Sequence, residues 1–192
     1  MVSQLSAVNV SPASPSVSPS GSAKVLRHPF LQAIEGTVQV FTSPHRSFFT
    51  NVMVQALRSA EQGRSVLIVQ FLRGGINQGP SHPTQMGQNL DWIRCGYAGC
   101  ITEATRDRTA AAAVTELWQH TRLMIEQASY GLVVLDELSL AIQYDLLPES
   151  EVLELLAARP PQLDVVLTGP QMPSAILALA DQVTEYRRDF LP

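Results

Sequence analysis

Runs of apolar residues recur along the chain and predict the strands of a sheet that is buried on both faces. Residues 65–71, 131–135 and 164–168 are almost continuously apolar, whereas residues 37–42 alternate between apolar and polar positions. Continuous runs of this length are typical of central strands in a parallel sheet. The expected strands are 37–42, 65–71, 131–135 and 164–168, with weaker candidates at 90–94 and 182–185.

Between these runs, apolar residues recur every three or four positions, which predicts helices with one buried face. Two clear stripes cover residues 49–60 and 114–128. A third covers residues 152–156 and ends before Pro160, because the residue preceding a proline is disfavoured in a helix. A short fourth helix is expected over residues 173–179.

The alternation of strands and helices predicts an α/β fold with a mostly parallel sheet and helices on both faces. Ligands of such sheets bind beyond the carboxyl ends of the strands. The connections that follow Thr42, Phe71 and Leu135 are therefore the candidate ligand-binding segments.

Composition divides the chain into a tail and one domain. Apolar residues make up 45% of the 192 residues and charged residues 16%, a balance typical of a globular domain with a sizeable core. Residues 1–23 differ, with eight serines, three prolines and no charge. Such a segment buries too little apolar surface to offset its ordering entropy. We expect a disordered tail over residues 1–30, with a tether or a phosphorylation target as alternatives, and a single domain over residues 31–192.

Charge and cysteine content exclude several classes of function. The net charge of −4 and the lack of a basic cluster argue against a nucleic-acid partner. No apolar run is long enough to span a membrane, and the N-terminus lacks the pattern of a secretory signal, so a cytoplasmic protein is expected. Cys95 and Cys100 form no zinc motif and are expected to be reduced thiols. The four histidines show no metal-binding spacing.

The segment after the first expected strand stands where a phosphate-binding loop would lie. Such a loop needs glycines that turn backbone N–H groups towards phosphate, a lysine for the outer phosphates and a hydroxyl for Mg²⁺. Residues 43–50 contain no glycine and no lysine, and Phe48-Phe49 replaces the lysine and the hydroxyl. A simple interpretation is that both phenylalanines pack the first helix onto the sheet.

An acidic pair, Asp136-Glu137, ends the strand that covers residues 131–135. Carboxylates at this place beside a phosphate loop commonly hold Mg²⁺ or orient a water molecule. The alternative is that the aspartate caps a helix that begins at Leu138, by accepting hydrogen bonds from its first N–H groups.

Seven short pieces of the sequence form an ordered set. They are residues 40–42 (Val-Phe-Thr), 69–74 (Val-Gln-Phe-Leu-Arg-Gly), 118–120 (Trp-Gln-His), 133–138 (Val-Val-Leu-Asp-Glu-Leu), 158–160 (Ala-Arg-Pro), 166–169 (Val-Leu-Thr-Gly) and 180–185 (Ala-Asp-Gln-Val-Thr-Glu). In this order and at these spacings, the set resembles the ATP:corrinoid adenosyltransferases of the cobalamin pathway. The resemblance covers roughly residues 36–188.

The resemblance implies a three-layer sandwich of the P-loop class and a homodimer. Members of the family transfer the 5′-deoxyadenosyl group of ATP to the reduced cobalt of a corrinoid, with Mg²⁺ and the phosphate loop holding the triphosphate. Because cobalt(I) is itself the nucleophile, the protein mainly positions the reactants and neutralises charge. ATP, Mg²⁺ and a corrinoid are the ligands that the resemblance implies.

The loop departs from the family pattern, which reads Gly-Asn-Gly-Lys-Gly-Lys-Thr-Thr over positions 43–50. Phe48 replaces the essential lysine and Phe49 the first threonine, whereas Arg46 keeps a positive charge and Thr50 keeps a hydroxyl. The residues that match the family's nucleotide and Mg²⁺ region are Arg46, Thr50, Asp136 and Glu137, of which Asp136 and Glu137 are the candidate metal ligands.

The missing residues indicate a degenerate site. Three or four lost charge-assisted hydrogen bonds, at roughly 1.5–3 kcal/mol each, weaken triphosphate binding by about 5–12 kcal/mol. We therefore expect a non-catalytic family member that binds a partner protein or a small ligand. The alternatives are an active adenosyltransferase with an altered nucleotide site and a corrinoid-binding protein that transfers no adenosyl group.

Overall fold

A seven-stranded sheet forms the centre of the protein. The computed structural model describes residues 35–104 and 107–187, so the tail predicted over residues 1–30 lies outside the described residues. The strand order is β3-β4-β2-β5-β6-β1-β7, and every pair is parallel except β3–β4. The strands are β1 (Val38–Thr42), β2 (Val66–Gly74), β3 (Thr84–Met86), β4 (Leu90–Cys95), β5 (Leu132–Asp136), β6 (Asp164–Thr168) and β7 (Gln182–Glu185).

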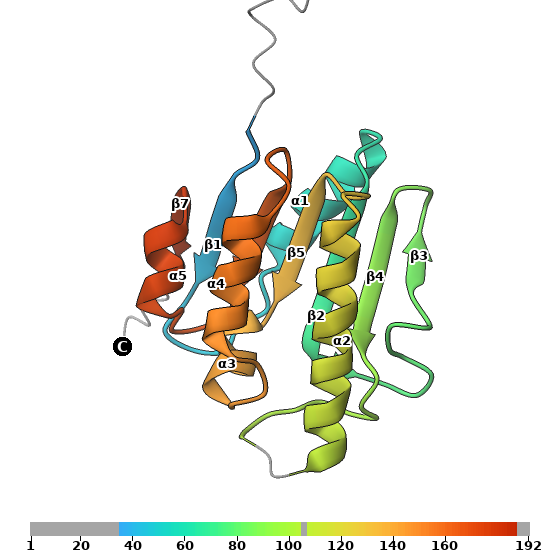
Figure 1. The fold of residues 1–192 in the computed structure, drawn as a ribbon, viewed down its shortest axis with the longest axis vertical. Helices are drawn as coiled ribbons and strands as arrows, with labels where there is room; N and C mark the ends of the chain where they lie inside the picture. Colours follow the sequence, from blue (N-terminus) through green and yellow to red (C-terminus); the bar gives the residue numbers. More distant parts are fainter. Residues whose placement is uncertain (1–34, 105–106, 188–192) are drawn as a thin grey trace, which may run out of the picture. The chain divides into compact units, whose positions relative to one another are not determined.

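Helices cover both faces of the sheet, which confirms the expected α/β sandwich. In Figure 1, α1 lies behind the sheet and α2 and α4 lie in front of it. The helices are α1 (Thr50–Glu61), α2 (Arg108–Glu126), α3 (Leu138–Gln143), α4 (Glu149–Ala158) and α5 (Ser174–Leu179). No helix of the described residues is both long enough and apolar enough to cross a membrane.

The period-two geometry of the strands divides the core into two clusters. In β5, Leu132 and Val134 pack in the cluster on the α1 side, whereas Val133 and Leu135 pack in the larger cluster under the other helices. The central strands β2, β5 and β6 are therefore apolar on both faces, which explains their continuous apolar runs in the sequence.

The six expected strands and the four expected helices are confirmed. One strand, β3, was missed, and the helix at Leu138 that the sequence offered only as an alternative is present as α3. β3 has no buried residue and pairs antiparallel with β4 at the edge of the sheet. It carries no apolar pattern because neither of its faces is covered. α3 has only six residues, which is too short to show a helical period, although four of them are buried.

The two phenylalanines before α1 have different environments. Phe49 is 4% exposed, packs in the α1-side cluster, and its ring centroid lies 5.7 Å from that of Tyr186. Phe48 is 45% exposed, and its ring faces the guanidinium of Arg73, whose Cζ is 5.1 Å from the ring centroid. The interpretation that both pack α1 onto the sheet is confirmed for Phe49 and wrong for Phe48, which is half-exposed and lies against Arg73.

We predict that Phe49→Ala lowers the free energy of unfolding by about 3–5 kcal/mol, because it leaves a cavity between α1 and the sheet. Phe48→Ala is the matched control and should lower it by only about 1 kcal/mol or less, since it removes one partly exposed cation–π contact. Urea unfolding of the two variants measures both values. Equal losses for the two variants contradict the assignment of Phe49 alone to the core.

Candidate functional site

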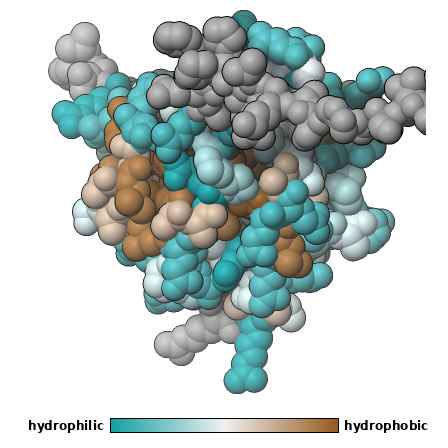
Figure 2. Space-filling view, turned by 45° about the horizontal axis from the view of Figure 1, so that its top comes forward, coloured by the Kyte–Doolittle hydropathy of each residue, from teal (hydrophilic) through white to brown (hydrophobic). Residues whose placement is uncertain are grey.

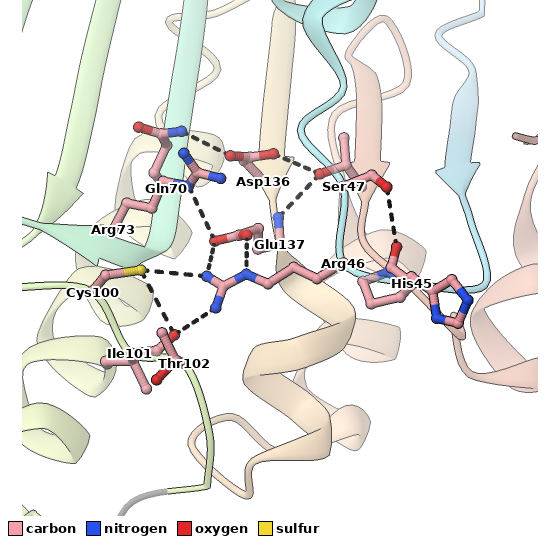
Figure 3. Close-up of polar contacts among 12 residues, drawn as sticks. His45, Arg46, Ser47, Gln70, Arg73, Cys100, Ile101, Thr102, Asp136 and Glu137 are labelled. Atoms are coloured by element: carbon pink, nitrogen blue, oxygen red, sulfur yellow. Dashed lines mark hydrogen bonds and ion pairs between the residues drawn. The ribbon is translucent and has the colours of Figure 1, made fainter. Parts of the chain in front are cut away.

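The carboxyl ends of four adjacent strands form the candidate site. The sheet order places β2, β5, β6 and β1 side by side, so their carboxyl ends meet at one edge. The loop after β1 covers residues 43–49. The backbone N–H of Ile101 donates to the Leu72 carbonyl at 2.9 Å and brings residues 100–102 to the same edge. Figure 3 shows the polar residues that these segments bring together.

A buried chain of hydrogen bonds crosses this edge and is centred on Asp136. Asp136 is 1% exposed and is paired in register with Gln70 of β2. Its Oδ2 accepts a hydrogen bond from Gln70 Nε2 at 2.8 Å, and its Oδ1 accepts one from Thr168 Oγ1 at 2.7 Å. Gln70 Oε1 in turn accepts one from Trp92 Nε1 at 3.0 Å. Both carboxylate oxygens of Asp136 are therefore bound by the protein, and burial raises its pKa.

Glu137 follows Asp136 but turns its side chain in another direction. Its backbone is left-handed, with φ 59° and ψ 26°, and its N–H donates to Thr168 Oγ1 at 3.0 Å. A left-handed backbone is uncommon for a residue with a Cβ and persists only where the surroundings hold it. The side chain is 3% exposed and points towards the loop after β1 (Figure 3).

Arg46 from that loop binds Glu137 in a two-pronged ion pair. Arg46 Nε lies 2.6 Å from Glu137 Oε1, and Nη2 lies 2.8 Å from Oε2. The third nitrogen, Nη1, donates to the Ile101 carbonyl at 3.0 Å, and Nη2 also lies 3.6 Å from the exposed thiol of Cys100. The hydrogen bond to Glu137 raises the pKa of Arg46 above its ordinary value. One guanidinium thus joins three separate segments of the chain (Figure 3).

A second arginine lies close to the same carboxylate. Arg73 Nε is 3.6 Å from Glu137 Oε2, which is an ion-pair distance but is too long for a hydrogen bond. This nitrogen is buried and has no hydrogen-bond partner among the described residues. Arg73 therefore adds positive charge beside Glu137 and leaves Arg46 as the residue that forms the hydrogen bonds.

The loop after β1 does not fit a magnesium-bound triphosphate. A phosphate-binding nest needs left-handed residues that turn successive N–H groups towards one point, and residues 43–49 contain no residue with positive φ. The N–H groups of Thr50 and Val52 at the start of α1 are already bonded to the carbonyls of Phe48 and Phe49.

In this structure, both carboxylates beside the loop accept hydrogen bonds from side chains of the protein. Arg46 donates two hydrogen bonds to the carboxylate of Glu137. Gln70 and Thr168 each donate one to the carboxylate of Asp136. Within residues 35–104 and 107–187, no group of three or more acidic, histidine or cysteine side chains could hold a metal ion. We therefore derive no chemical step through magnesium.

Of the four residues predicted for the nucleotide region, the structure brings together Arg46 and Glu137. Asp136 lies behind them in its own hydrogen-bond chain. Thr50 is the exposed first residue of α1, and its hydroxyl makes no hydrogen bond to any described residue. The alternative that Asp136 caps α3 is wrong, because Glu137 holds the N-cap position and no side chain caps this helix.

Sequence reasoning missed Gln70, Thr168, Arg73 and Ile101. Gln70 is the single polar residue among the seven buried positions of β2, and this signal could have identified it. Thr168 ends β6 at the level where Asp136 ends β5, which the parallel register could have shown. Ile101 acts through its carbonyl group, for which the sequence carries no signal.

Comparison with known proteins identifies the family. A model of the ATP:corrinoid adenosyltransferase family BtuR/CobO/CobP matches residues 34–189. The chain belongs to this family. The resemblance inferred from the sequence pieces is confirmed.

Named relatives of this ATP:corrinoid adenosyltransferase family align with most of the chain. The corrinoid adenosyltransferase of Escherichia coli strain K12 is 34% identical over 154 residues, which are 79% of this chain and 76% of the relative. Corrinoid adenosyltransferase CobA of Salmonella typhimurium is 34% identical over 158 residues, which are 81% of this chain and 79% of the relative. A corrinoid adenosyltransferase of a Sinorhizobium species is 27% identical over 155 residues, which are 79% and 72%.

We predict that Asp136 makes the stability of the fold depend on pH. Its pKa is raised above the ordinary 3.8, so the folded state holds the proton more tightly than the unfolded state. The stability that Asp136 contributes is full below pH 3.8 and declines as the pH rises through the raised pKa. The decline is about 1.4 kcal/mol for each unit by which folding raises the pKa.

Asp136→Asn removes this titration and serves as the reference. The free energy of unfolding of the native protein minus that of the variant should fall as the pH rises above about 4 in urea titrations. A difference that stays constant or grows over this range contradicts the burial argument.

Proposed function

We propose that this chain is a non-catalytic member of its family, a pseudoenzyme that does not use Mg-ATP and acts by binding a partner protein or a small ligand. The observation that carries the proposal is the ion pair between Arg46 and Glu137, at 2.6 Å and 2.8 Å, in the position of the nucleotide site. The carboxylate that would face the magnesium-bound triphosphate is already bound to a cation of the chain.

Energies support this proposal over ordinary use of ATP. Mg-triphosphate has to displace Arg46 to reach Glu137, and this displacement breaks the two charge-assisted hydrogen bonds of the pair. The hydrogen bonds that the loop lacks weaken binding by a further 5–12 kcal/mol or so. A micromolar ligand is bound by only about 8.2 kcal/mol, so the combined loss removes ordinary affinity.

Exposed apolar side chains at the same edge of the sheet suit a binding role. Phe48 is 45% exposed in the loop after β1, and Ile76 is 83% exposed in the loop after β2. A second apolar surface lies at the edge that carries α5 and β7 (Figure 2), where Leu179 and Val183 are each 47% exposed. Exposed apolar groups of this kind are typical of contact surfaces. The proposal includes a homodimer, as the family resemblance implies, and a location in the cytoplasm, as the sequence analysis expects.

The second candidate is an active adenosyltransferase. Three of its relatives are named corrinoid adenosyltransferases, and two of them are 34% identical to the chain. Asp136 and Glu137 are present, and α1 begins after β1 as in a phosphate site. In this candidate, Arg46 leaves Glu137 when the nucleotide binds.

Calorimetric titration with Mg-ATP distinguishes the two candidates. We predict that the native chain gives no saturable heat and does not adenosylate a reduced corrinoid under anaerobic conditions. Saturable Mg-ATP binding together with turnover that Asp136→Ala abolishes contradicts the proposal and favours the active enzyme.

A loop graft provides the positive control. Gly-Asn-Gly-Lys-Gly-Lys replaces positions 43–48, and Phe49 is kept because it is part of the core. The graft restores glycines and a lysine and removes Arg46 from Glu137, so detectable Mg-ATP binding is expected. Circular dichroism must show that the graft is folded before titration. A folded graft that binds no nucleotide shows that the change of the site extends beyond this loop.

A further inference from the structure

We propose that Glu137 is a cation-binding site that the chain fills from within, and that the Arg46 guanidinium is its occupant. The inference rests on the proposed function, because it explains what has replaced the magnesium-bound nucleotide at this edge of the sheet. It adds a prediction of its own: without the Arg46 side chain, an external cation binds at Glu137.

The burial of Glu137 makes a cation necessary. The Glu137 side chain is 3% exposed, and the side chain of Arg46, which binds it, is 26% exposed. A buried carboxylate without a partner is strongly destabilising, whereas the same carboxylate in a well-formed pair is tolerated. The positive charge of Arg46 therefore balances the buried negative charge of Glu137.

The geometry selects a guanidinium group. Arg46 uses Nε and Nη2 for the two carboxylate oxygens and Nη1 for the Ile101 carbonyl at 3.0 Å. An ammonium ion is a point charge and cannot reproduce this flat, forked arrangement of donors. The site is therefore complementary to a guanidinium ion in both charge and shape.

Arg73 is the competing cation, and its contacts explain why it does not replace Arg46. Its Nε stays 3.6 Å from Glu137 Oε2, and its guanidinium lies over the ring of Phe48. The buried Nε has no other partner among the described residues. Arg73 strengthens the positive field around the carboxylate but leaves the forked position to Arg46.

Chemical rescue tests this inference on the full chain. Arg46→Ala should lower the melting temperature by roughly 6–12 °C, because the carboxylate stays buried without its forked partner. Millimolar methylguanidinium should raise the melting temperature of this variant and leave that of the native chain unchanged. Methylammonium at the same ionic strength is the matched control and should restore less.

The double variant Arg46→Ala/Glu137→Gln tests whether methylguanidinium acts by binding at Glu137. It should recover most of the lost melting temperature and show no response to methylguanidinium, because the buried charge is gone. If Arg46→Ala alone does not fold, a folded double variant supports the inference, and failure of both variants to fold overturns it.

Two further outcomes overturn the inference. One is an Arg46→Ala protein that melts within about 2 °C of the native chain. The other is rescue of equal size with and without Glu137. The failure of the proposed function is a different result, namely saturable binding of Mg-ATP to the native chain, and it leaves the rescue comparison unaffected.

Discussion

The carboxylate of Glu137 is buried, and the arrangement of the surrounding loops depends on how its charge is balanced. Moving a carboxylate out of water has an effective cost of several kcal/mol, which only close positive groups and good hydrogen bonds offset. Here the offset comes from the forked contact with Arg46 and the nearby charge of Arg73. Arg46 also donates a hydrogen bond to the carbonyl of Ile101. The same guanidinium that neutralises Glu137 therefore links the loop after β1 and residues 100–102 to the start of α3.

The parallel sheet creates this situation by bringing strand ends together. Asp136 and Glu137 leave β5 beside Gln70 of β2 and Thr168 of β6, and the hydrogen bonds of Thr168 join the two acidic residues. Asp136 is satisfied by neutral donors and faces back into the sheet. Glu137 has a left-handed backbone and faces the loop, at a conformational cost of order 1–3 kcal/mol. At the edge that forms a nucleotide site in a phosphate-loop protein, Arg46 is hydrogen-bonded to Glu137 in this structure.

The sequence predicted the fold well because the fold depends on local periodicity. The strands around Val133 and Val166 and the stripe of α1 are long enough to show their periods. β3 is short and was missed, and the short helix α3 was expected only as an alternative. The site was predicted in part. Position after a strand was enough to single out Asp136 and Glu137, and the family pattern singled out Arg46. The contact between Arg46 and Glu137 spans 91 positions, so no spacing in the sequence could show it.

The central claim is that Arg46 and Glu137 stabilise the fold as a pair, and a double-mutant cycle tests it most directly. Urea unfolding of the native chain, Arg46→Ala, Glu137→Gln and the double variant gives the coupling energy between the two side chains. The account predicts a coupling of about 2 kcal/mol or more, as measured for close buried charge pairs. A coupling below about 1 kcal/mol, typical of exposed surface pairs, contradicts it.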